Sequence, residues 1–194
     1  MSSRRESTSI TLIESVRNDA PGAWDRFVQI YSPLVYHWCH TKSRLSREDT
    51  ADVMQDVFLS VSKSIASFQR DQQGSSLRAW MRVITLNKIR TLAKRVKRQP
   101  AAVGGTEAQR WALSLPEADV SADDELLETS ILMRKAIEIL RDHFNSSTYT
   151  AFWLVAMEGR STDDVAETLG LSGSAVRQAC YRVRKRLRDE LGGI

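Results

Sequence analysis

The chain has 194 residues, 42% of them hydrophobic, and a formal net charge of +4. This length suffices for one domain or two small ones with ordinary hydrophobic cores. No apolar run reaches transmembrane length and no leader peptide is recognisable, so we expect a soluble, cytoplasmic protein without membrane insertion.

The two cysteines, Cys39 and Cys180, lie far apart without a CxxC pattern, which excludes a disulfide scaffold or a zinc knuckle. His37, Cys39 and His40 are close in sequence, but a helix would turn Cys39 about 200° away from His37. The only other histidine is His143. We therefore expect neither a metal site nor a cofactor.

The first helix is predicted over Ser9 to Arg17, where apolar residues recur at helical spacing. The Asp19–Gly22 segment indicates a stop and a restart. Two short helices are expected to follow. The first would pack its aromatic face in the core, and the second would start at Pro33; the core residues are Trp24, Phe27, Val28 and Tyr31, then Leu34, Val35, Trp38 and Cys39.

Ser46 to Asp49 resembles a capping box and predicts the start of the next helix. Its apolar stripe comprises Met54, Val57, Phe58, Val61, Ile65 and Phe68. The opposite face carries Asp49, Asp52, Gln55 and Asp56, with no cation of the chain at an ideal spacing to pair with them. This face is either a solvated acidic surface or the binding surface for a basic partner.

A basic helix is predicted over Leu77 to Arg98. No acidic residue lies between Gln72 and Thr106, whereas eight basic ones do: Arg78, Arg82, Lys88, Arg90, Lys94, Arg95, Lys97 and Arg98. One face reads Trp80, Val83, Asn87, Arg90, Thr91, Lys94, Arg98, a composition suited to bases at one end and phosphates at the other. The alternative is a solvated surface helix with Trp80 in the core.

Residues 99–123 contain Gly104, Gly105 and Pro116 without sustained periodicity and are predicted to be a flexible linker. The acids of this part of the chain form an acidic spacer: Glu107, Glu117, Asp119, Asp123, Asp124, Glu125 and Glu128. Helical spacing resumes at Asp124, and Tyr149 to Met157 is apolar almost all round, which predicts a buried helix. No stretch shows strand alternation. The predicted fold is all-α, with two small helical domains.

The last part of the chain has the spacing of a helix-turn-helix. Ser161 can cap one short helix that ends at Gly170, and Ser172 can cap the next. The second helix has a buried stripe of Val176, Cys180, Val183 and Leu187. Its opposite face carries Arg177, Gln178, Tyr181, Arg182, Lys185 and Arg188. Arg and Gln can each make two-pronged hydrogen bonds to base edges, which predicts DNA binding.

Three motifs in this order resemble the extracytoplasmic-function (group IV) sigma factors of bacterial RNA polymerase. They are Asp52-Val-Met-Gln-Asp-Val-Phe58, then Leu77-Arg-Ala-Trp-Met-Arg-Val-Ile-Thr-Leu-Asn87, then the helix-turn-helix. The resemblance implies an alternative sigma factor that binds core RNA polymerase, directs it to promoters and helps melt the −10 element. Residues 8–98 would be a region 2-like domain and residues 124–192 a region 4-like domain. An anti-sigma factor is a further candidate partner.

The resemblance also implies roles for particular residues. The predicted core-polymerase contacts are Asp49, Asp52, Gln55 and Asp56. The predicted −10 DNA contacts, with the 68–76 loop, are Phe68, Trp80, Asn87, Lys88, Arg90, Thr91, Lys94, Arg95 and Arg98. The predicted −35 DNA contacts are Ser174, Arg177, Gln178, Tyr181, Arg182 and Lys185.

Two other classes of protein explain the sequence less completely. A helix-turn-helix regulator with a helical N-terminal domain would explain the C-terminal half, but neither the second basic zone nor the acidic face at Asp52. An enzyme such as a DNA recombinase would need a catalytic domain with strands and an arranged nucleophile, and the sequence shows neither. We therefore expect a promoter-binding protein without catalytic residues.

Overall fold

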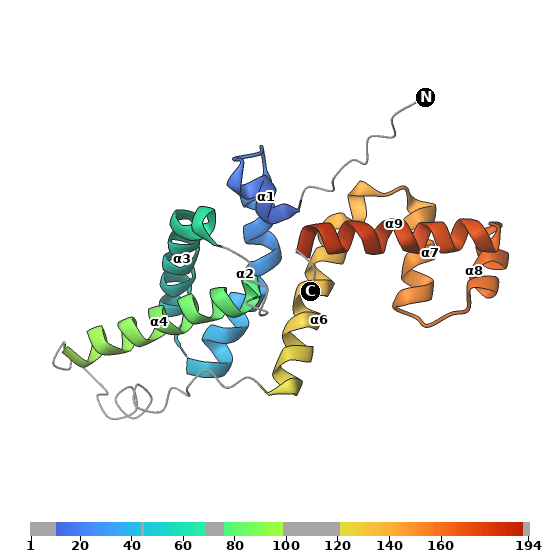
Figure 1. The fold of residues 1–194 in the computed structure, drawn as a ribbon. Coiled ribbons are helices and arrows are strands. Elements are labelled where there is room, and N and C mark those ends of the chain that lie inside the picture. Colours follow the sequence, from blue (N-terminus) through green and yellow to red (C-terminus); the bar gives the residue numbers. More distant parts are fainter. Residues whose placement is uncertain (1–10, 44, 69–75, 99–120, 192–194) are drawn as a thin grey trace. The chain divides into compact units, whose positions relative to one another are not determined.

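The computed structural model describes residues 11–43, 45–68, 76–98 and 121–191, and every regular element within these ranges is helical (Figure 1). This confirms the predicted all-α class. Within the same ranges, no helix combines the length and the apolar character needed to cross a bilayer. The described residues form two compact units. One unit holds those from 27 to 132, and the other holds those before 27 together with those after 132.

The unit of residues 27–132 is built on α2 (Ala23–Ser43), α3 (Arg47–Ser64) and α4 (Leu77–Arg98), with a short 3-10 turn at Ile65–Ser67. α3 and α4 pack side by side (Figure 1). Ser46 caps α3 as predicted, because its Oγ accepts a hydrogen bond from the Asp49 backbone N–H at 3.0 Å. The cap fixes where the acidic face of α3 begins.

The prediction of two short helices separated at Pro33 was wrong, because α2 is one helix with Pro33 inside it. A proline inside a helix costs about 3 kcal/mol or more, since it lacks an N–H and its ring clashes with the preceding turn. Burying one large apolar side chain stabilises by roughly 1.5–3 kcal/mol. α2 buries such side chains on both sides of the proline: Phe27, Ile30, Tyr31, Leu34 and Trp38. Their summed burial outweighs the local cost.

A buried charge cluster ties α4 to the first half of α6 (Ala122–Leu140) within this unit. Arg82 is 6% exposed and Glu128 is 2% exposed, and their side chains form an ion pair. The Glu128 carboxylate also accepts a hydrogen bond from the Trp38 indole N–H at 2.7 Å and lies 3.6 Å from Nε of Arg78. Arg78 also donates to Oγ1 of Thr129 at 2.6 Å. Burial lowers the pKa of Arg82, and the nearby carboxylates of Asp124 and Glu125 act in the opposite direction.

In the sequence, the two partners of this ion pair belong to two segments of opposite charge. Arg82 was grouped with the basic zone and Glu128 with the acidic spacer, as if both were solvated. In the structure both are core residues of one unit. Arg82 is therefore not available to bind a polyanion, and Glu128 is not part of a solvated linker. The rest of the predicted linker, residues 99–120, lies outside the described residues.

The other unit contains α1 (Leu12–Arg17), the second half of α6, and α7 (Ser146–Ala156), α8 (Thr162–Leu169) and α9 (Gly173–Leu191), with a 3-10 turn at Arg141–His143. Glu190 near the end of α9 is buried and pairs with Arg26 at 3.1 Å and Arg186 at 2.7 Å. α7 was expected to be buried on all sides. It buries only one face and Trp153 is partly exposed, because among the described helices only α8 and α9 pack closely on it.

α8 and α9 form the predicted helix-turn-helix, packed on α7 (Figure 1). Ser161 Oγ accepts from the Asp164 N–H at 3.1 Å, and Ser172 Oγ accepts from the Ala175 N–H at 3.2 Å. Gly170 ends α8 with a φ of 63°, a left-handed conformation that glycine adopts without steric cost. The caps and the glycine set the angle at which α9 leaves the turn.

Candidate nucleic-acid and partner interfaces

The outward face of α4 brings together the predicted base-reading residues. Asn87, Thr91 and Lys94 are exposed, and Arg90 is half-buried. Arg90 Nη1 donates to Oδ1 of Asn87 at 3.4 Å, and the Thr91 hydroxyl donates to the Asn87 carbonyl oxygen at 2.9 Å. A carboxamide, a hydroxyl and two cations therefore share one surface, which suits a base edge next to phosphates. The side chain of Arg98 lies outside the described residues.

Phe68 and Trp80 form an aromatic pair at the start of this face. Their ring centroids are 5.0 Å apart with planes inclined by 38°. Trp80 is half-buried, so it combines the two roles that the sequence left open, a core residue and a surface ring. Phe68 is only 7% exposed, so its ring would contact a base only after moving. Its role in DNA binding stays a prediction, and residues 69–75 lie outside the described residues.

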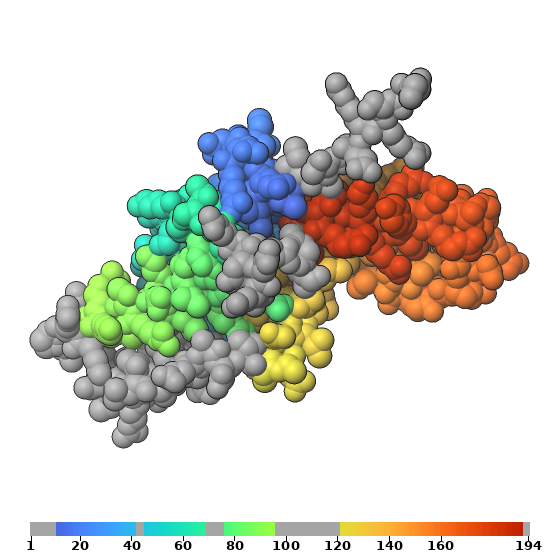
Figure 2. Space-filling model, in the orientation of Figure 1, coloured from blue at the N-terminus to red at the C-terminus, as the bar shows by residue number. Residues whose placement is uncertain are grey.

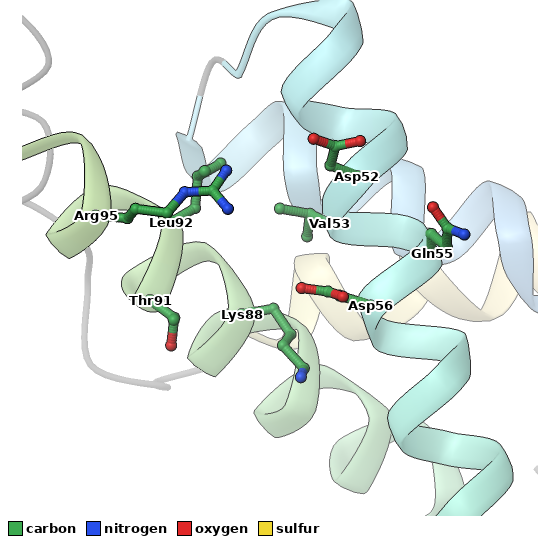
Figure 3. A pocket seen from close by; sticks show the side chains of 8 residues that line it. All are labelled: Asp52, Val53, Gln55, Asp56, Lys88, Thr91, Leu92 and Arg95. Atoms are coloured by element: carbon green, nitrogen blue, oxygen red, sulfur yellow. The ribbon is translucent and has the colours of Figure 1, made fainter. Parts of the chain in front are cut away.

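A pocket of about 250 Å³ lies between α3 and α4 (Figure 3). α3 contributes Asp52, Gln55 and Asp56, while α4 contributes Lys88, Thr91 and Arg95; Val53 and Leu92 form its apolar part. Asp56 and Arg95 extend from opposite sides into the space between the helices (Figure 3). The sequence shows no cation at an ideal spacing to pair with the acidic face of α3. In the structure that face shares this groove with two cations of α4.

Asp49, the fourth predicted polymerase contact, has a structural task as well. Its Oδ2 accepts a hydrogen bond from the Ser46 hydroxyl at 2.8 Å, and the residue is half-buried. Asp52, Gln55 and Asp56 are exposed. The exposed part of the predicted polymerase-binding face is therefore centred on these three residues, with Asp49 at its edge.

Every predicted −35 contact occupies an exposed position on the outward face of α9. The red surface in Figure 2 belongs to α9. Tyr181 is 61% exposed, so its ring is accessible to a binding partner. The Arg177 guanidinium lies over the start of the helix, since a methyl group added at Gly173 would be 3.3 Å from its Nη1. The Ser172 and Ser174 hydroxyls lie 3.0 Å apart. The opposite face is buried at Val176, Cys180, Val183 and Leu187, as predicted.

Comparisons with known proteins agree with this arrangement. Residues 27–99, which span most of α2 and all of α3 and α4, match the family Sigma-70 region 2. The chain is 29% identical over 170 residues to ECF RNA polymerase sigma factor SigM of Mycobacterium tuberculosis, covering 88% of this chain and 78% of that protein. It is 24% identical over 186 residues to ECF RNA polymerase sigma-E factor of Haemophilus influenzae, covering 95% of each.

A helical domain that matches sigma region 2, followed by a helix-turn-helix with an exposed basic face, defines a sigma factor. The relatives that match across most of the chain narrow this class. The protein is a sigma factor of the extracytoplasmic-function group, a transcription initiation factor that directs RNA polymerase. This confirms the resemblance drawn from the sequence motifs. An ordinary helix-turn-helix regulator would leave the match to region 2 unexplained.

Proposed function

We propose that this sigma factor binds core RNA polymerase through α3, melts and reads the −10 element through α4, and reads the −35 element through α9. Residues 8–98 act as the region 2-like domain and residues 124–192 as the region 4-like domain, joined by residues 99–123. The protein works in the cytoplasm on promoter DNA, and an anti-sigma factor is a candidate regulator. The match of residues 27–99 to sigma region 2 supports this division most directly.

The proposed polymerase surface has the chemistry of a protein-binding site. Asp52, Gln55 and Asp56 lie on one exposed face of α3, within one helical turn of each other. Two carboxylates so close repel each other slightly in the free protein. A cationic partner group would relieve that repulsion and gain from both charges, so binding to core polymerase should depend on them.

Reversing both charges with Asp52→Lys and Asp56→Lys should weaken assembly with core polymerase by roughly tenfold or more, since like charges would then face each other. The measurement is the affinity of the purified full chain for core polymerase in the absence of DNA. The matched control is Asp142→Lys with Glu158→Lys, two exposed carboxylates outside this surface. A folded double mutant of α3 with the affinity of the control would remove α3 from the interface.

Asn87→Ala should leave core binding nearly normal and reduce opening of the −10 element. A base flipped out of the duplex costs a few kcal/mol, and a pocket that reads its edge can offset part of that. Permanganate reactivity of −10 thymines reports strand opening directly. Gln29→Ala, which removes an exposed amide from α2, is the control. Reactivity as high in the Asn87 variant as in the control would exclude Asn87 from base capture.

A further inference from the structure

The groove between α3 and α4 is lined by residues with two different predicted partners. The resemblance predicts that those of α3 contact core polymerase and that those of α4 contact −10 DNA. Its α3 wall carries Asp52 and Asp56, and its α4 wall carries Lys88 and Arg95. These four side chains form no ion pair with one another in the described part of the chain. Opposite charges thus face one groove without forming an ion pair, which leaves all four side chains available to an incoming segment.

Helix geometry separates two pairs of predicted −10 contacts on α4. Lys88 and Arg95 are seven residues apart, close to two turns, so they project from the same side of the helix. Asn87 and Lys94 have the same spacing but project about 100° away, because each residue of a helix advances by that angle. Only the first pair lines the groove. Neighbouring basic residues of α4, Lys94 and Arg95, therefore face different surroundings.

DNA is a poor occupant for this groove. A phosphate that approached Lys88 or Arg95 there would also approach the carboxylates of Asp52 and Asp56, which repel it. A purely cationic segment would meet the opposite problem at the α4 wall. A protein segment with both an anion and a cation satisfies both walls, and the apolar Val53 and Leu92 between them favour a packed side chain over solvated phosphate.

We infer that the groove between α3 and α4 binds a segment of core polymerase that carries both charges, and that Lys88 and Arg95 contact this segment and not −10 DNA. The inference rests on the proposed polymerase binding through α3 and extends that interface onto α4. It reassigns two residues that the sequence motifs had placed with the DNA contacts. The acidic group of the partner should lie against α4 and its basic group against α3.

Single charge reversals on α4 test this assignment. Lys88→Glu and Arg95→Glu should each weaken the affinity of the full chain for core polymerase, measured without DNA, by roughly tenfold or more, since an anion of the partner would then face an anion. Lys88→Gln, a milder change at this half-buried position, should weaken binding in the same direction. Circular dichroism verifies that each variant is folded.

Two further reversals of the same size serve as references. Lys63→Glu, at the exposed end of α3 and outside the groove, should leave the affinity for core polymerase unchanged. Lys94→Glu should also leave core binding unchanged, but should weaken binding of the assembled holoenzyme to promoter DNA.

The sign of the effect decides between the alternatives. If the partner segment were purely cationic, Lys88→Glu and Arg95→Glu would strengthen core binding, and that result would overturn the inference. Unchanged core binding with impaired promoter binding would return both residues to the DNA surface and overturn it as well. The proposed function fails separately, if reversal of Asp52 and Asp56 has no effect or if the unmodified chain does not bind core polymerase.

Discussion

Replacing Glu128 by Gln should lower the free energy of unfolding of the chain by about 3–5 kcal/mol, because it leaves a buried arginine without its counter-charge. Arg82 is held in the core of its unit by Glu128, and the Trp38 indole and Arg78 converge on the same carboxylate. The substitution keeps the shape of the side chain and removes only the charge. Chemical denaturation followed by circular dichroism measures the change.

The same helix offers a matched control for this prediction. Glu138 pairs with Lys135 at 3.1 Å, but the Glu138 side chain is 68% exposed. Exposed pairs contribute about 0–1 kcal/mol, so Glu138→Gln should have little effect. Arg82→Met should also cost less when Glu128 is already Gln than in the unmodified chain, because the two changes remove one interaction. Equal losses from the Glu128 and Glu138 variants would contradict the buried cluster.

The elements that could be predicted from the sequence are those set by local signals. Ser161 and Ser172 start α8 and α9, because each side chain accepts a hydrogen bond from a backbone N–H three residues further on. Gly170 ends α8, because it adopts the left-handed conformation without steric cost. The exposed row on α9 followed from helical spacing alone. For the same reason the motif at Ser46 gave the correct start of α3.

The errors arose where distant residues decide the outcome. Pro33 carries a strong local stop signal, yet the core around α2 keeps the helix continuous. Arg82 and Glu128 are 46 positions apart, and nothing in their local sequence distinguishes them from solvated charges. The shared groove of α3 and α4 depends likewise on how two helices pack. Sequence spacing places residues on a face, but it does not state what lies opposite that face.

This distinction bears on α9, where exposure is established but the contact each residue makes is still a prediction. Arg177 and Gln178 lie in the first two turns of the helix, which in helix-turn-helix proteins is the end that contacts base edges. Lys185 lies seven residues after Gln178, about 10 Å further along the axis. A straight helix leaves the groove over such a distance, so Lys185 should contact phosphates.

Gln178→Ala should therefore weaken binding by about 1–3 kcal/mol for promoters that carry the preferred base pair at the position that Gln178 reads. Promoters with a different base pair at that position should lose little affinity. Lys185→Ala should instead weaken all promoters alike and reduce the salt dependence of binding by about one unit of slope. Binding of each variant holoenzyme to a library of −35 sequences, at two salt concentrations, separates the two patterns. A uniform loss from Gln178→Ala across the library would make Gln178 a backbone contact and leave Arg177 and Arg182 as the candidates for sequence selection.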